Sequence, residues 1–308
     1  MVGVGPRRVA LLVMAVTAVS FSAIFIREAR APSLSIALWR NVMAAAVVFP
    51  AALLLRRDEL RRLNRRQVGV AVLSGALLAV HFAVWIASLS YTTIAASVVL
   101  VTASPIFVAA ASRALFGERV ARITFVGILV GLAGAALVSG GDLALSGRAA
   151  FGDGLAVLGA LAAGGYFLAG RRLRQDLSLL TYVGIVYAVC AVLLIPIALV
   201  GGAPFTGFPA RTWVMFALLA AVPQLLGHTT FNFLLKDTTA TLVAISVMGE
   251  PIGSTLLGLA FFTEVPPWTA VAGGLLILVG IYVATTAQAR SRRRADPGVG
   301  PPVPVPVE

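Results

Sequence analysis

Ten long apolar segments alternate with short polar connections along most of the chain. Each segment approaches the roughly 20 residues that an α-helix needs to cross the hydrocarbon core of a bilayer. The predicted spans are residues 9–26, 33–55, 68–88, 94–113, 121–140, 153–170, 179–200, 212–234, 239–262 and 267–287. The pattern therefore predicts an all-α integral membrane protein with ten transmembrane helices.

The second half of the chain repeats the first at a constant offset of 146 residues. The matched pairs include Thr92 and Thr238, Thr93 and Thr239, Pro105 and Pro251, Phe116 and Phe262, Gly127 and Gly273, and Gly134 and Gly280. Matches of Pro and paired Thr at one unbroken offset are harder to obtain by chance than matches between common apolar residues. We therefore predict two five-helix repeats, residues 1–146 and 147–289.

Residues 290–308 form a different kind of segment. Four arginines lie between Arg290 and Arg294, and five prolines follow without an apolar period. This composition predicts a disordered tail, because too little apolar surface is available to offset the entropy of ordering it. We expect these arginines to fix the membrane topology of the chain. The alternative is that they bind anionic lipid headgroups.

Composition places the chain in the membrane class. Hydrophobic residues make up 59% and charged residues 12% of the chain, and the mean hydropathy is +0.98. A net charge of +12 in a soluble protein suggests nucleic acid, but these arginines cluster between apolar spans. We therefore expect the lipid bilayer as a partner and no nucleic acid.

The first span follows Arg7 and Arg8, as the apolar run of a secretory leader does. It continues to Ile26, precedes charged residues, and pairs with an internal span at the repeat offset. We therefore expect a retained transmembrane helix.

The distribution of basic residues predicts the orientation. With a cytoplasmic amino terminus, 19 Lys and Arg residues lie on the cytoplasmic side and four on the other. The positive-inside rule thus places both termini in the cytoplasm, and we expect a multi-pass protein of the cytoplasmic membrane of a prokaryote. Because each repeat holds an odd number of helices, the two repeats enter the membrane from opposite sides.

Inverted repeats are typical of secondary transporters, in which two similar halves expose a midplane site alternately to each side. The alternatives are a membrane scaffold, a membrane enzyme or a passive channel. The sequence contains no HExxH, no GxxxxGK[ST] and no Cys/His metal spacing. We therefore expect no enzymatic activity, catalytic residue, cofactor or metal, and a small molecule as the substrate.

Two charged residues lie well inside predicted spans. A charge near the bilayer centre costs on the order of 3 kcal/mol or more, so it tends to face a cavity or a partner. Arg40 either contacts substrate, snorkels outward or pairs with another helix, and Glu250 is either a proton or cation site or part of a buried ion pair. Their repeat partners are Val186 and Ser104, so the chemistry at mid-depth is predicted to be asymmetric.

Pro105 and Pro251 occupy matching positions within the fourth and ninth spans. Proline frees the carbonyl four residues earlier and bends a helix. Each is predicted to act either as a hinge beside the site or as a static kink.

Polar side chains also recur at helical spacing. In the eighth span three of them lie four residues apart, which places them on one stripe. The predicted cavity residues are Gln224, His228 and Asn232 in this stripe, His81 and Trp85 in the third span, and Tyr166 as a weaker candidate. Such stripes also bond neighbouring helices.

The runs Ser104-Pro105 to Phe116-Gly117-Glu118 and Gly249-Glu250-Pro251 to Phe262-Thr263-Glu264, each followed by two spaced glycines, resemble the paired EamA-type domains of the drug/metabolite transporter superfamily. The resemblance covers residues 7 to 287. It implies two inverted five-helix halves, a central cavity walled mainly by helices 1, 3, 4, 6, 8 and 9, and export or exchange of small metabolites such as amino acids. Glu118 and Glu264 each precede a new span, where a negative charge favours a helix amino terminus.

We accordingly expect a secondary-active exporter or exchanger that works by alternating access, with protons as a candidate coupling ion. The sequence does not indicate an oligomeric state.

Overall fold

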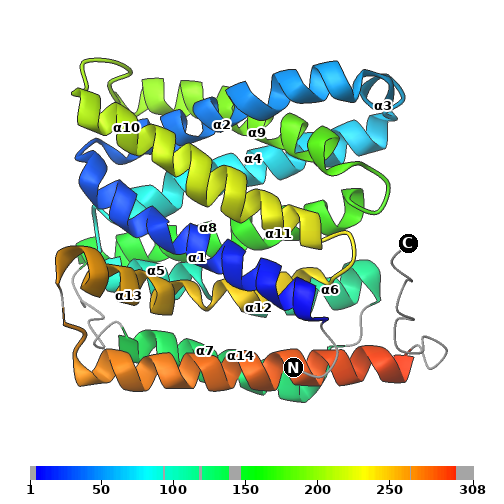
Figure 1. The fold of residues 1–308 in the computed structure, drawn as a ribbon, viewed down its shortest axis with the longest axis vertical. Helices are drawn as coiled ribbons and strands as arrows, with labels where there is room; N and C mark the ends of the chain where they lie inside the picture. Colours follow the sequence, from blue (N-terminus) through cyan, green and yellow to red (C-terminus); the bar gives the residue numbers. More distant parts are fainter. Residues whose placement is uncertain (1–4, 93, 118–119, 139–146, 264, 296–308) are drawn as a thin grey trace, which may run out of the picture.

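The computed structural model describes residues 5–92, 94–117, 120–138, 147–263 and 265–295, and all regular structure within these ranges is helical. The first half contains α1 (Pro6–Ala29), α2 (Ser33–Leu55), α3 (Arg57–Arg61), α4 (Arg65–Ser88), α5 (Ile94–Val101), α6 (Ser104–Phe116) and α7 (Arg122–Val138). The second half contains α8 (Gly147–Leu173), α9 (Leu179–Val200), α10 (Ala210–Leu219), the π-helix η1 (Ala220–His228), α11 (Thr229–Leu234), α12 (Ala240–Val247), α13 (Glu250–Phe262) and α14 (Trp268–Ala295). Figure 1 shows the long helices stacked side by side.

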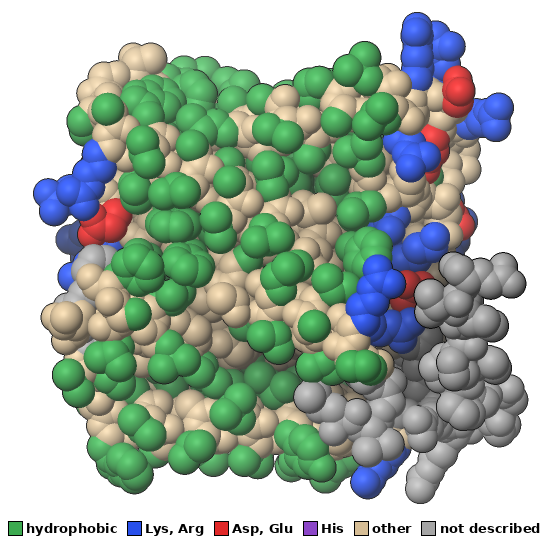
Figure 2. Space-filling model, in the orientation of Figure 1, with side chains coloured by type: hydrophobic (Ala, Val, Ile, Leu, Met, Phe, Trp, Pro, Cys, Tyr) green, Lys and Arg blue, Asp and Glu red, His purple; other side chains and the backbone are tan. Residues whose placement is uncertain are grey.

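The described helices form a multi-pass membrane protein. Eight candidate spans are long and apolar enough to cross a membrane, and the shorter apolar helices α6 and α7 fall at the fourth and fifth predicted spans. Figure 2 shows a broad face of apolar side chains between two edges where Lys and Arg gather. Apolar residues such as Val192 and Leu275 are exposed on the bundle, which is stable only against lipid. The predicted fold class is confirmed.

The repeat is visible in the helix boundaries. At the offset of 146 residues, α5 coincides with α12, α6 with α13, and the first residues of α2 and α7 with those of α9 and α14. Even the helix ends agree, because Gly117 and Thr263 both adopt the left-handed conformation, at φ 63° and 54°. Each five-helix unit is thus one structural repeat.

Equivalent helices run in opposite directions. A Cβ atom placed on Gly134 of α7 would lie 2.6 Å from the carbonyl oxygen of Gly273 in α14, and one on Gly127 would lie 2.8 Å from that of Gly280. The order of these contacts reverses along the two helices, so α7 and α14 are antiparallel, as inversion requires. The glycines let the two backbones approach closely, which favours helix association in a bilayer.

The first helix of each half packs among helices of the other half. Helix α1 lies against α10, η1 and α13, while α8 lies against α4, α5 and α6. The pairs α2–α9 and α7–α14 join equivalent helices at opposite sides of the bundle (Figure 1). The interior is therefore walled by residues from both halves.

Two predicted spans are discontinuous. The span 94–113 divides into α5 and α6, and the span 239–262 divides into α12 and α13. Both breaks fall just before a proline that starts a new helix, where its missing N–H costs no intrahelical hydrogen bond. Pro105 and Pro251 therefore mark helix breaks rather than bends in one continuous helix.

The predicted start of the tail is wrong, because α14 continues through Ala295. Arg, Gln and Ala are strong helix formers, so the helix extends beyond its apolar segment. The remaining tail, 296–308, lies outside the described residues, as do Glu118 and Glu264.

Candidate functional site

A small cavity lies inside the bundle, between the two halves. Its wall includes the six spans that the family resemblance implies and one more, the second span, which contributes Arg40. The polar lining residues are Ser22, Arg40, His81, Thr102, Ser104, His228 and Glu250. Its free volume is about 40 Å³, which accommodates a few water molecules.

The two helix breaks meet at this cavity. Ser104 and Glu250 are the first residues of α6 and α13, and Val101 and Val247 are the last residues of α5 and α12. All four line the cavity. Two helix amino termini, with their partial positive charge, and two helix carboxyl termini therefore lie beside the same space.

Arg40 is fully buried and reaches the cavity from α2. Its Nη2 donates to Oε1 of Gln224 at 3.0 Å, and its guanidinium carbon lies 4.1 Å from the centre of the Phe82 ring. Nε and Nη1 have no hydrogen-bond partner in the described part of the chain. The side chain therefore points inward, and the snorkelling alternative is wrong.

Glu250 lines the same cavity and is half-buried. The described residues contain no ion pair between Glu250 and Arg40 within 4.0 Å, although the two charges are near enough to interact electrostatically. The cavity thus holds one cationic and one anionic side chain that do not touch.

The two histidines and Trp85 line the cavity and form an aromatic, polar part of its wall. Nδ1 of His81 lies 2.9 Å from the carbonyl oxygen of Gly159, and its ring stacks on Trp85 at 5.7 Å. His228 packs edge-on against Phe82 at 5.5 Å, and its buried Nδ1 has no partner among the described residues.

The π-helix η1 coincides with an irregularity of the repeat. His81 and His228 are 147 residues apart, one more than the repeat offset, yet both line the cavity. A π turn holds about one residue more than an α turn, so the nine residues of η1 rotate later positions relative to the regular helix α4. Proline at Pro223, inside η1, removes a donor that a regular α-helix needs.

Gln224, Asn232 and Tyr166 lie behind the cavity wall rather than in it. Gln224 accepts the hydrogen bond from Arg40. Asn232 donates to the hydroxyl of Tyr166 and, at 2.9 Å, to the carbonyl oxygen of His228. Gln224 and Asn232 therefore bond residues that face the cavity, and Tyr166 in turn bonds Asn232.

Sequence reasoning missed three aromatic residues, Phe82, Phe167 and Phe231. Phe167 and Phe231 line the cavity, and Phe82 touches Arg40. The repeat contained the signal, because Phe82 is the partner of His228 and Phe231 is the partner of Trp85 at the offset of 146 residues.

Comparison with known proteins agrees with this architecture. The EamA-like transporter family matches residues 7–140 and 150–286, one match for each repeat. The chain belongs to the EamA-like transporter family.

Individual relatives of this EamA-like transporter are distant but cover most of it. The pseudopaline exporter CntI of Pseudomonas aeruginosa is 25% identical over 88% of this chain and 93% of its own. An uncharacterized transporter of Archaeoglobus fulgidus is 27% identical over 72% of this chain and 76% of its own. A crystal structure with 21% identity superposes with a TM-score of 0.78 over 92% of this chain and 98% of the other, which shows the shared fold.

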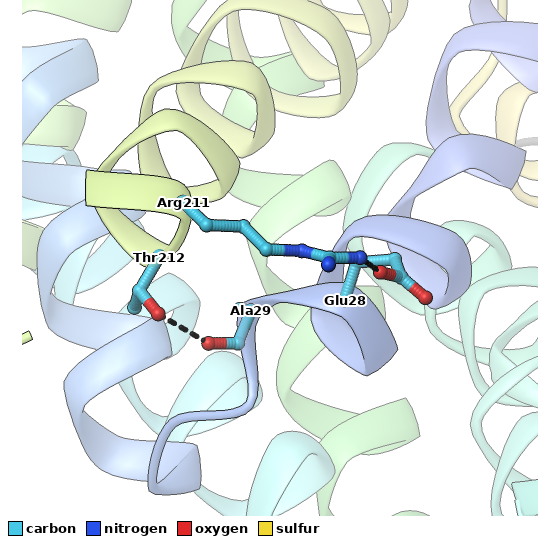
Figure 3. Close-up of polar contacts among 4 residues, drawn as sticks. All are labelled: Glu28, Ala29, Arg211 and Thr212. Atoms are coloured by element: carbon cyan, nitrogen blue, oxygen red, sulfur yellow. Dashed lines mark hydrogen bonds and ion pairs between the residues drawn. The ribbon is translucent and has the colours of Figure 1, made fainter. Parts of the chain in front are cut away.

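Two contacts join the halves at one end of this EamA-like transporter. Figure 3 shows Arg211 of α10 extending to the carboxylate of Glu28 in α1, beside a 2.7 Å hydrogen bond from Thr212 to the carbonyl oxygen of Ala29. The ion pair is solvent-exposed at Arg211, whereas Thr212 is buried. The hydrogen bond from the Thr212 hydroxyl is therefore screened less by solvent and salt than the Arg211–Glu28 ion pair.

A different contact joins the halves at the opposite end, where α3 precedes α4. The carboxylate of Glu59 accepts hydrogen bonds from the backbone N–H and hydroxyl of Ser178, both at 2.6 Å, and from the hydroxyl of Thr181 at 2.7 Å. Burial by itself raises the pKa of Glu59, but the hydrogen bonds from Ser178 and Thr181 lower it overall. Glu59 thus caps the amino terminus of α9, where a negative charge is favourable.

Proposed function

We propose that this EamA-like transporter is a secondary-active exporter or exchanger of small metabolites, amino acids or related compounds, that works by alternating access. The cavity shared by two inverted halves is the observation that carries the proposal. Such halves exchange conformations, so that one site faces each side in turn.

The geometry supports a mechanism in which the cavity must open. A free volume of about 40 Å³ is enough for water and too small for a metabolite. Pro105 and Pro251 lie at helix breaks beside the cavity, where a change of a few backbone angles moves a whole half-helix. We propose these breaks as the hinges.

Orientation and coupling follow from the charges. We propose that both termini and the arginine-rich end with α3 lie in the cytoplasm of a prokaryote, in accordance with the positive-inside rule. Glu250 is the proposed proton carrier, because it is the carboxylate that lines the cavity in the described part of the chain. CntI, a relative named as an exporter, supports the direction of transport. We expect no catalytic activity.

The deciding experiment is counterflow in proteoliposomes. Vesicles loaded with an unlabelled panel of amino acids and small organic acids are diluted into each compound in labelled form. A carrier gives transient, saturable uptake of label above the equilibrium level. Uptake that equilibrates without overshoot indicates a channel, and no uptake of any compound in right-side-out and inverted vesicles indicates a scaffold.

Glu250→Gln tests the coupling role. We expect loss of transport driven by a pH gradient with counterflow retained, because exchange needs no net proton movement. Asp58→Asn is the matched control, since Asp58 is exposed on α3 and distant in the fold from the lining residues. Unchanged pH dependence in Glu250→Gln would rule out Glu250 as the proton carrier.

A further inference from the structure

Arg40 carries a charge that the folded chain leaves partly unsatisfied. An arginine has five N–H donors, and three of them belong to Nε and Nη1, which have no partner among the described residues. The side chain has 0% exposure. An ion buried without a partner costs several kcal/mol, so these donors need an acceptor in the cavity, either water or a group of the ligand.

The surroundings of Arg40 supply no anion in contact with it. The ionisable groups around it are His81 of α4, Tyr187 and Cys190 of α9, His228 of η1 and Glu250 of α13. Glu250 is the carboxylate of this set, and it stands farther away than an ion pair allows. The chain therefore leaves these N–H groups open to a ligand, whose anionic group would displace cavity water when it binds.

The guanidinium is held in a defined position. Gln224 accepts from Nη2 on one side, and the Phe82 ring covers one face. Gln224 is itself anchored, because the hydroxyl of Tyr187 donates to its backbone carbonyl oxygen at 3.3 Å. A guanidinium with fixed orientation and open N–H groups is suited to a planar, singly charged acceptor such as a carboxylate.

We propose that Arg40 binds the carboxylate of the transported ligand and thereby selects carboxylate-bearing metabolites over the corresponding amides. The inference rests on the proposed transport function and assigns the ligand class and its orientation. The carboxylate lies at Arg40, beside the amino terminus of α6 at Ser104, which adds partial positive charge. The apolar part of the ligand lies against Trp85, Phe167 and Phe231.

The charge balance of the cavity favours a single negative charge on the ligand group that binds Arg40. Arg40 offsets a single carboxylate, whereas a doubly charged phosphate would add a net negative charge beside Glu250 in a low-dielectric interior. Glu250 also competes with the ligand for Arg40. The proposal therefore predicts opposite effects at the two residues, with carboxylate binding weakened at Arg40→Gln and strengthened at Glu250→Gln.

The test is calorimetric binding to the purified protein in lipid nanodiscs. The probes are a panel of monocarboxylates, including L-leucine and 3-phenylpropanoate, and the primary amide of each. We expect wild type to prefer carboxylate over amide, Arg40→Gln to reduce this preference about 10- to 100-fold, the range expected for a charge-assisted hydrogen bond, and Arg40→Lys to retain part of it. Glu250→Gln should increase it.

The matched control is Arg172→Gln, which removes the same charge from an exposed position at the end of α8. Its preference should equal that of wild type, and the melting temperature of each variant shows that it is folded. Equal affinity of wild type for carboxylates and amides, or an unchanged preference in Arg40→Gln, would overturn the inference. Preferential binding of carboxylates over amides without any counterflow would contradict the transport proposal and leave the carboxylate site standing. Counterflow without a preference for carboxylates would support transport and contradict the carboxylate site.

Discussion

The close contact between α7 and α14 makes a sharp prediction about stability. In Gly134→Ala the new Cβ atom would lie 2.6 Å from the carbonyl oxygen of Gly273, about 0.8 Å closer than the 3.4 Å at which ordinary contact begins, and 2.7 Å from the backbone nitrogen of Ile277. Both neighbours are backbone atoms, so the helices must separate. Overpacking of this kind costs about 3 kcal/mol, at the upper end of the usual range.

The higher helix propensity of alanine offsets about 1 kcal/mol of that cost, so we expect a net loss of about 2 kcal/mol in Gly134→Ala. Gly69→Ala is the matched control, because Gly69 lies within α4 and has no atom within 4 Å of the position of a Cβ. That variant should be as stable as wild type or slightly more stable.

Thermal unfolding in detergent, followed by tryptophan fluorescence, measures both variants under the same conditions. The double variant Gly134→Ala with Gly273→Ala should lose less than the sum of the two single losses, because one separation of the helices relieves both contacts. A Gly134→Ala protein that melts at or above the temperature of Gly69→Ala would refute the close-packing argument.

Further predictions concern the contacts at the two ends. Glu59→Gln should destabilise the protein by about 2 kcal/mol at pH 7, because it removes the charge that accepts three hydrogen bonds. The folded-state pKa of Glu59 is lowered from 4.5, so this stabilisation is fully present above pH 4.5 and is lost as the pH falls through the folded-state pKa. The melting temperatures of wild type and Glu59→Gln should therefore converge between pH 7 and pH 3. A difference in melting temperature that stays constant over this range would refute the capping role. Arg211→Gln should change stability by less than about 0.5 kcal/mol, because its ion pair is exposed to solvent, whereas Thr212→Val should cost about 1 kcal/mol by leaving a buried carbonyl without its donor. Equal melting shifts for these two variants would contradict the assignment of the hydroxyl as the stronger contact.

Much of the architecture could be predicted because hydrophobic length and repeat offset are local properties of the chain. The boundaries of α2 and α9 agree with the predicted spans to the residue. The ends of helices next to charged residues were harder to predict. Arg and Gln end an apolar run in the sequence, but as strong helix formers they can continue the helix. The end of α14 at Ala295 is the clearest case.

The site was predicted in part, and its errors have a common cause. Spacing along one helix cannot distinguish a residue on the cavity wall from one in the layer behind it, so His228 and Asn232 looked equivalent. In the folded chain His228 lines the cavity, whereas Asn232 bonds the hydroxyl of Tyr166 and the carbonyl oxygen of His228. The only sequence signal for Phe82 was its repeat partner, His228, whereas its contact with Arg40 became visible only in the tertiary structure.

The amino-acid sequence alone was sufficient to establish a duplicated, ten-span membrane protein with inverted halves, because span length, repeat offset and the distribution of basic residues can be read along the chain without knowledge of tertiary contacts. The tertiary structure showed that α1 and α8 each pack against helices of the opposite half. It also showed that both helix breaks meet at one cavity and that Arg40 points inward. These features depend on contacts between residues distant in sequence, where packing rather than local pattern sets the geometry.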